Sequence, residues 1–148
     1  MPDQSTIEKA KKDKAQGKSA STQAGEFVHD EIDKVRQGKH GVRSVKQAIA
    51  IGLSEARRSG VKLPPPKTGG AALKKKARQD EEKAKSNAPV SQKRSRARIK
   101  ALKKEPTNTV SSTALSKQAA TAAKKRTAAD RSKSAKKAAR TRAANKNK

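Results

Sequence analysis

The 148-residue sequence lacks cysteine and has one aromatic residue, Phe27. Without thiols, the chain cannot form a disulfide framework, a thiolate zinc site or a thiol-based catalytic centre. Modules that bind single-stranded nucleic acid or RNA typically stack bases on aromatic rings. Because Phe27 falls on a helix face and is interpreted as a core residue, the sequence favours duplex over single-stranded nucleic acid.

Long hydrophobic runs and catalytic motifs are also missing. No segment approaches the roughly 20 apolar residues of a membrane span, and the N-terminal segment has no apolar signal core. His29 and His40 have no clustered carboxylates or nucleophile motif around them, and we interpret them as a helix surface residue and a turn residue. No phosphate-binding loop or dinucleotide fingerprint is present. We therefore expect a cytoplasmic protein that is not an enzyme and that has no cofactor, no metal site and no membrane partner.

Apolar and acidic residues are both scarce. Hydrophobic residues make up 30% of the chain, and 39 Lys and Arg face 13 Asp and Glu, which gives a net charge of +26. Burial of so little apolar surface cannot offset the entropy of ordering the whole chain. Residues 1–60 carry a net charge of +4, whereas residues 111–148 carry +11. The sequence thus predicts one small ordered module followed by long, basic, solvated segments.

The nearly neutral part predicts two helices. In residues 22–37, apolar residues at steps of three and four form one stripe: Ala24, Phe27, Val28, Ile32 and Val35. Glu31 falls within this stripe, so either the stripe is narrow or Glu31 meets a basic partner such as Arg43. Ser44 and Gln47 then form a capping box that starts a second helix, and Gly38 and Gly60 have the positions of helix-ending residues.

The two helices predict a hairpin of about 40 residues, which is too small to be stable without a staple or a partner. We expect either self-association, as a possible homo-oligomer, or docking of a downstream helix. The expected contact residues for self-association are Phe27, Ile49, Ile51 and Leu53.

The predicted fold class is all-α, with a small helical hairpin module followed by basic helical or disordered segments. We expect a flexible charged arm over residues 1–20, the hairpin module over 21–61 and a Pro/Gly linker over 62–70. Charged helical segments follow over 71–105, and a Lys/Ala-rich basic tail, largely disordered when free, covers 106–148.

The segments "STQAGEFVHDEI" and "GKHGVRSVKQAIAIGLSEARRSGVKLPPP" resemble a group of small basic bacterial proteins. These proteins share an uncharacterised helical-hairpin domain and are variously labelled DNA-binding or plasmid-stabilisation proteins. The resemblance covers roughly residues 1–66 and implies a link to DNA, without binding or catalytic residues to carry over. The tail is similar in composition to the tails of linker histones and bacterial histone-like proteins.

The charge pattern predicts histone-like, mostly sequence-nonspecific DNA binding at the nucleoid, in which basic side chains neutralise phosphates without reading bases. There are two alternatives to DNA binding. The protein is associated with structured RNA or the ribosome, or its hairpin binds a partner protein. The turn between the two predicted helices, "GKHGVRS", is either a phosphate contact beside a helix N-terminus or an ordinary glycine-bounded turn. At the other end of the second helix, Arg57 and Arg58 either bind phosphate or complement the helix dipole. The candidate nucleic-acid-binding residues are Lys39, Arg43, Arg57, Arg58, Lys93, Arg94, Arg96, Arg98, Lys124, Lys125, Arg126, Lys136, Lys137, Arg140 and Arg142.

Overall fold

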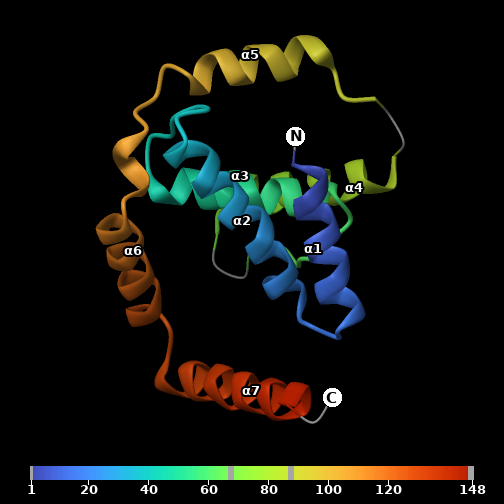
Figure 1. The fold of residues 1–148 in the computed structure, drawn as a ribbon, viewed down its shortest axis with the longest axis vertical. Coiled ribbons are helices and arrows are strands. Elements are labelled where there is room, and N and C mark those ends of the chain that lie inside the picture. Colours follow the sequence, from blue (N-terminus) through green and yellow to red (C-terminus); the bar gives the residue numbers. More distant parts are fainter. Residues whose placement is uncertain (1, 67–68, 87–88, 147–148) are drawn as a thin grey trace. The chain divides into compact units, whose positions relative to one another are not determined.

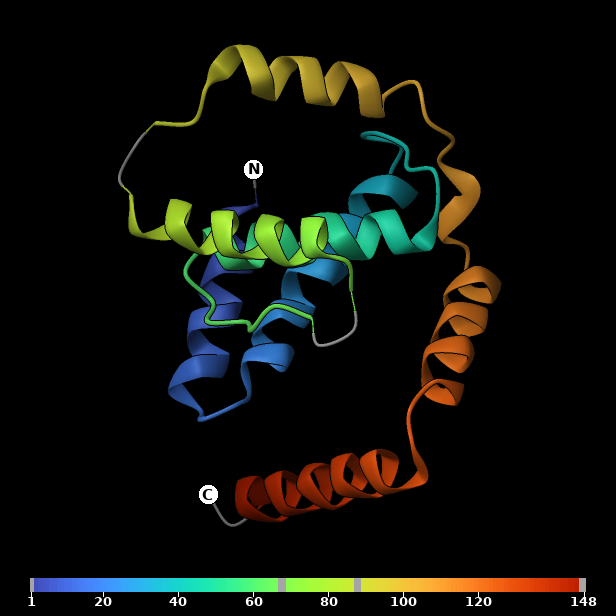
Figure 2. The same ribbon diagram turned by 180° about the vertical axis from the view of Figure 1, so that it is seen from behind.

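The computed structural model describes residues 2–66, 69–86 and 89–146, and all regular structure within these ranges is helical (Figures 1 and 2). The predicted all-α class is confirmed. The elements are α1 (Gln4–Ala15), α2 (Ala20–Arg36), α3 (Val45–Arg58), α4 (Ala71–Lys85), α5 (Gln92–Leu102), the 3₁₀ turn η1 (Asn108–Val110), α6 (Ser112–Lys124) and α7 (Ala128–Lys146).

The chain divides into two units, residues 1–111 and residues 112–148. We had expected the main boundary at the Pro/Gly linker of residues 62–70, two of which, 67 and 68, lie outside the described residues. The first unit instead continues past this linker, because α4 and the segment after α5 both return to the hairpin. The ordered module is therefore larger than the predicted hairpin of residues 21–61.

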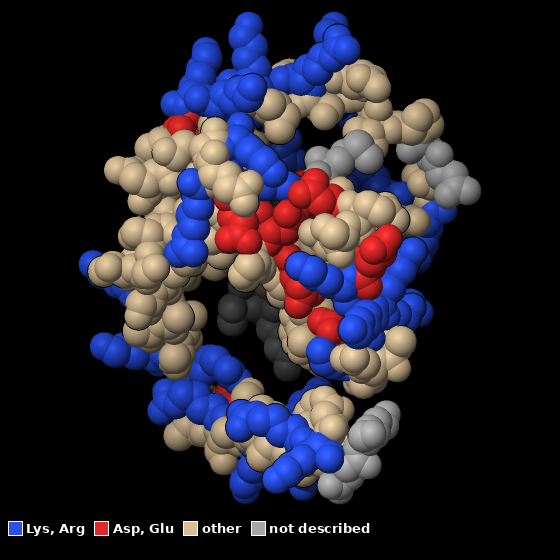
Figure 3. Space-filling model, viewed as in Figure 1, with Lys and Arg blue, Asp and Glu red and all other residues tan. Residues whose placement is uncertain are grey.

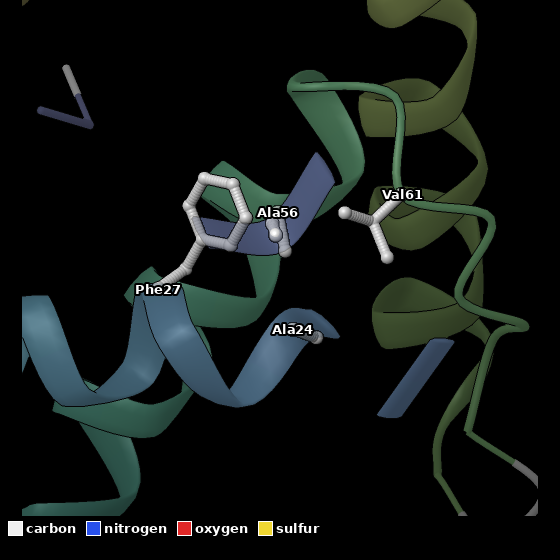
Figure 4. Packing of buried hydrophobic residues seen from close by; sticks show 5 residues of the cluster. Ala24, Phe27, Ala56 and Val61 are labelled. Atoms are coloured by element: carbon white, nitrogen blue, oxygen red, sulfur yellow. The ribbon is translucent and has the colours of Figure 1, made fainter. Parts of the chain in front are cut away.

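The core of the first unit lies between α1, α2 and α3. Phe27 of α2 is fully buried, and its ring lies toward Ala56 of α3 (Figure 4). Ala10 of α1 belongs to the same buried cluster, and Ile7 packs against it. Because Ile7 and Ala10 are three residues apart, they share one face of α1 and cover the core with it. The expected flexible arm over residues 1–20 is thus replaced by a helix packed on α2.

The α2 and α3 helices cross closely, and most of the sequence signals at their ends are confirmed. A Cβ at Gly52 of α3 would lie 2.7 Å from the Cα of Val28 in α2, so only glycine permits this approach. Ser44 caps α3, because its hydroxyl oxygen accepts a hydrogen bond from the Gln47 N–H at 3.3 Å. The capping box is only half formed, because Gln47 Oε1 accepts a hydrogen bond from the Arg43 N–H at 2.7 Å and not from the Ser44 N–H. Gly38 and Gly60, at the ends of α2 and α3, have φ angles of +72° and +89°, in the left-handed region that favours glycine.

The α4 helix docks on α3 through a buried carboxylate, Asp80. Asp80 is 1% exposed and accepts hydrogen bonds from Ser54 Oγ at 2.7 Å, Arg58 Nε at 2.9 Å and Lys76 Nζ at 2.5 Å. Burial opposes the charge on Asp80, but these three donors outweigh it and lower the pKa of the carboxyl group. Docking of a downstream helix is therefore present. Phe27 and Ile51 are buried inside this unit, so self-association through them stays an untested prediction that requires the unit to open.

Residues 102–110, here called the strap, hold the turn between α2 and α3 from outside. The Gly41 N–H donates to the Leu102 carbonyl and the Val42 N–H to the Pro106 carbonyl, both at 3.0 Å. A Cβ at Gly41 would lie 1.8 Å from the Glu105 carbonyl oxygen, so the strap can approach only a glycine. Leu102 and Val110 anchor the strap with exposures of 7% and 1%. The end of α5 is thereby fixed to the turn.

The second unit contains α6 and α7 and buries none of its residues 112–146. Thr127 caps the start of α7: its Oγ1 accepts a hydrogen bond from the Asp130 N–H at 3.1 Å and donates one to Asp130 Oδ2 at 2.8 Å. The structure thus has helices where we expected a largely disordered tail. The alanines favour this helix, whereas repulsion among the basic residues opposes it, so disorder of the free tail stays a prediction.

Candidate nucleic-acid interface

The α5 helix presents one strongly basic face. Its N-terminus is capped by Ser91, and residues 92–104 contain seven Lys or Arg and no Asp or Glu. At about 100° per residue, Lys93, Arg96, Lys100 and the C-cap residue Lys103 fall within one arc of the helix, away from the buried Leu102, and Lys104 follows in the turn after α5. All five are exposed, and Lys and Arg side chains project outward along α5 at the top of Figure 3. This basic face consists of Lys93, Arg96, Lys100, Lys103 and Lys104.

Only two of the four α5 residues that we predicted lie on this face, Lys93 and Arg96. Arg94 and Arg98 fall on another side of the helix, and Arg98 is close enough to Glu31 to oppose the rise in the pKa of its carboxyl group. The sequence prediction missed Lys100, Lys103 and Lys104. A helical-wheel plot anchored on Leu102 and Ile99, the sizeable apolar residues of this segment, would have found them.

Lys103 connects the basic face to the turn between α2 and α3. One open depression on the surface is lined by Ser95, Arg96, Ile99, Lys100 and Lys103. A second is lined by Gly38, Lys39, His40, Gly41, Lys103 and Thr107. Because Lys103 borders both, the predicted turn residue Lys39 lies next to the basic face of α5. We call this combined surface, Lys39 with the five side chains of the basic face, the basic platform.

Beneath the platform, His40 and Glu31 form a buried pair. His40 lies in the turn between α2 and α3, as expected, but it is 7% exposed, and its Nε2 lies 3.6 Å from Glu31 Oε2. Of the alternatives for Glu31, a narrow stripe or a basic partner such as Arg43, the structure gives a side-chain partner, which is His40. His40 Nδ1 lies 3.3 Å from the Gly41 carbonyl, which only accepts, so Nδ1 carries a proton. The contact between Nε2 and Oε2 is therefore attractive when a further proton lies on either group.

Burial raises the pKa of Glu31, and the negative charge of Glu55 adds to this rise, while His40, Lys34 and Arg98 oppose it. Glu31 Oε1 has no hydrogen-bond partner among the described residues. Arg43 pairs instead with Glu105 of the strap, through Nη2 at 3.1 Å, and its side chain remains 78% exposed. Arg43 thus fastens the strap and still reaches the surface.

Arg57 and Arg58 have internal partners. Arg57 is 8% exposed and donates through Nε to the Leu63 carbonyl at 3.2 Å. Arg58 pairs with Asp80, as described above, and also donates to Ser54 Oγ at 2.8 Å. The Arg57 guanidinium group holds the segment after α3 against α3, and the Arg58 guanidinium group holds α4 against α3. We therefore withdraw them as candidate phosphate contacts, because each would have to break a contact of the folded unit.

In the second unit, all the predicted residues are exposed: Lys124, Lys125, Arg126, Lys136, Lys137, Arg140 and Arg142. Arg126 donates hydrogen bonds to the Asp130 carbonyl, at 2.9 Å, and to Ser134 Oγ. Arg126 therefore lies against α7, whereas Lys136, Lys137, Arg140 and Arg142 line the helix itself. Lys and Arg side chains cover much of α7 at the bottom of Figure 3.

Among the described residues, no group of three or more His, Cys, Asp or Glu side chains is arranged to hold a metal ion. None of the described helices is long and apolar enough to cross a membrane. The platform and α7 are thus the surfaces on which a functional proposal rests.

The comparison with known protein families gives one match. Residues 4–67 match a family of unknown function, DUF6496. The matched range spans α1, α2 and α3, so the resemblance to an uncharacterised helical domain is supported, while its description assigns no function. No curated protein and no solved structure matches the chain.

Proposed function

We propose that this protein binds double-stranded DNA, mostly without sequence preference, through the basic platform of its first unit and the basic helix α7 of its second. A nucleoid location follows from this proposal. The observation that carries it is the basic platform, in which six exposed cationic side chains are held on a folded scaffold.

The arrangement of charge supports a polyanion as the ligand. Phosphate contacts position a protein on a duplex and supply most of its nonspecific affinity. The acidic side chains nearest the platform are already engaged, since Glu105 pairs with Arg43 and Glu31 lies buried beneath His40. The α5 segment of residues 92–104 has no acidic residue of its own. Its cationic groups therefore remain available for phosphates.

The architecture also supports weak sequence preference. The platform side chains are five lysines and one arginine, and residues 92–104 contain no aromatic side chain on which a base could stack. Lysine acts as a flexible point charge, unlike the planar fork of arginine that reads guanine. Such a surface suits the phosphate backbone more than base edges.

A salt-series titration of duplex DNA tests this proposal. Replacing Lys93, Arg96, Lys100 and Lys103 with Gln removes four platform charges, and each lost phosphate contact lowers the log–log salt slope by about 0.9. A matched control replaces four exposed lysines of α1 with Gln: Lys9, Lys11, Lys12 and Lys14. We expect the platform variant to lose a slope of about 3 to 4 and the control to change little.

Two results would contradict the proposal. Equal losses in the platform variant and the α1 control would show that only total charge matters and would remove the platform from it. Failure of the full chain to bind duplex DNA at low salt would overturn DNA binding altogether. A structured RNA of equal length serves as the competitor, and preference for that RNA would favour the alternative of an RNA-associated basic protein.

A further inference from the structure

The α7 helix carries its positive charge in two separate rows. At about 100° per residue, Lys133, Lys136, Lys137 and Arg140 form one row, and Arg131, Arg142 and Lys146 form the other, on the opposite side of the helix. Arg131 Nη1 donates to the Ala123 and Arg126 carbonyls, at 3.3 Å and 3.0 Å, so Arg142 and Lys146 are the side chains of the second row that the proposal uses for phosphate. One face between the rows, here called the inner face, contains Ser132, Ala139 and Ala143. The other, here called the outer face, contains Asp130, Ser134, Thr141 and Asn145.

The two faces between the rows differ in size and in charge. The inner face has only small side chains, so an approaching surface can come close to the helix backbone. The outer face includes Asp130, the acidic residue of this unit, and it is covered in part by Arg126, which donates to Ser134 Oγ and to the Asp130 carbonyl. The outer face is thus turned toward its own chain, and the inner face is left open.

We propose that α7 lies along the major groove of B-form DNA, with its inner face toward the base edges and one basic row against the phosphates of each strand. This inference rests on the proposed DNA binding and specifies its geometry. A single basic face would contact the phosphates of only one strand. Two basic rows separated by small side chains can each face the phosphates of one strand, while the small side chains face the base edges between the strands.

The dimensions of the groove agree with this placement. The major groove of B-form DNA is about 12 Å wide and admits an α-helix. The 19 residues of α7 are about 28 Å long, less than the roughly 34 Å of one helical turn of DNA. The major groove of A-form RNA is deep and too narrow for side chains to read. The arrangement of α7 therefore selects duplex DNA over duplex RNA.

Matched variants of the full chain test the orientation of α7. Ser132→Glu with Ala139→Glu places two carboxylates on the inner face, and Ser134→Glu with Thr141→Glu places two on the outer face. Both pairs are seven residues apart and change the net charge equally, while Ser132 and Ser134 lie about 200° apart around the helix. A carboxylate pressed unpaired into the groove is costly, so we expect the inner variant to bind DNA about tenfold or more weakly than the outer variant.

A second pair of variants tests the two rows separately. Lys136→Gln with Arg140→Gln removes two charges from one row, and Arg142→Gln with Lys146→Gln removes two from the other. Glutamine keeps the helix propensity close to that of the basic residues, so the helix itself is preserved. We expect each pair to lower the log–log salt slope for DNA by about 2, because both rows contact phosphate.

The outcomes separate this inference from the proposed function. Equal weakening by the inner and outer variants, or a slope that falls for only one row, overturns the groove placement while DNA binding itself stands. An inner-face effect of the same size on an A-form RNA duplex also overturns it. Failure of the unmodified chain to bind DNA overturns the proposed function instead.

Discussion

Asp80 provides the sharpest test of how the first unit is held together. Its carboxylate is buried beneath α3 and accepts hydrogen bonds from a serine hydroxyl, a guanidinium group and an ammonium group. Asp80→Ala removes all three bonds in a single change and leaves a small void at the contact of α3 and α4. We therefore expect α4 to lose most of its attachment to α3.

The expected loss of stability follows from the environments of the three donors. A hydrogen bond to a charged group contributes about 1.5–3 kcal/mol. The three bonds do not simply add, because the Arg58 and Lys76 side chains are 33% and 50% exposed and recover hydration when the carboxylate is lost. Ser54 is buried and keeps only its bond from Arg58. We expect Asp80→Ala to lower the free energy of unfolding by about 2–3 kcal/mol.

Urea unfolding followed by circular dichroism measures this loss. The matched control is Glu82→Ala, which removes an exposed carboxylate two residues away on the same helix and should cost no more than about 0.5 kcal/mol. Equal effects of the two substitutions would refute the docking of α4 through Asp80. Because the folded pKa of Asp80 is lowered, its contribution is present above the ordinary aspartate pKa and is lost as the pH falls through the folded value. The difference between wild type and Asp80→Ala should therefore shrink in acid.

Three further substitutions probe the strap, the buried pair and the core. Gly41→Ala forces a Cβ into a strap carbonyl and should lower stability by about 1–3 kcal/mol, whereas Gly25→Ala, with open space around it, should slightly stabilise α2; thermal unfolding of both distinguishes them. Glu31→Gln should gain stability relative to wild type as the pH rises above the ordinary glutamate pKa, because a raised folded pKa makes the wild type lose stability there; urea unfolding across pH would show no such trend if Glu31 were not buried as a carboxylate. Phe27→Ala should cost about 3–5 kcal/mol in the same urea assay, while Val90→Ala at an exposed site should cost less than about 0.5 kcal/mol.

Local sequence signals predicted the α2 and α3 helices and their ends. A cap or a helix-ending glycine acts within a few residues of itself, so Ser44, Gly38 and Gly60 were readable without knowledge of the fold. The α1 helix was missed because its apolar residues are few and lie among lysines. Ile7 and Ala10 can be recognised as core residues only when α1 is known to pack on the cluster that contains Phe27.

Contacts between distant segments could not be read from the sequence. Asp80, Glu81 and Glu82 are adjacent carboxylates, and only the placement of α4 on α3 shows that Asp80 is the buried one. The small size of the predicted hairpin indicates that a downstream helix could dock on it, but it does not identify α4 as that helix.

The candidate site was predicted only in part, because it also depends on contacts between distant segments. Charge runs locate the basic segments, but they do not show which side of a helix each side chain takes: Lys93 and Arg96 lie on the basic face, whereas Arg94 and Arg98, predicted with them, do not. Arg57 and Arg58 look equally basic in the sequence. In the structure their guanidinium groups are engaged inside the folded unit, with the Leu63 carbonyl and with Asp80. Lys103 gains its place between α5 and the turn only through the strap, whose contacts span about 60 residues of sequence.

The family match and the proposed DNA-binding surface occupy different parts of the chain. Residues 4–67 include the turn with Lys39 and Arg43, but the five basic residues of the α5 face and both rows of α7 lie beyond that range. Affinity that comes from neutralised phosphates scales with the number of cationic contacts. Most of the proposed DNA affinity must therefore come from residues 92–146, so a protein that shares only the matched helices need not bind DNA. The matched helices instead supply the scaffold to which the strap fixes the platform.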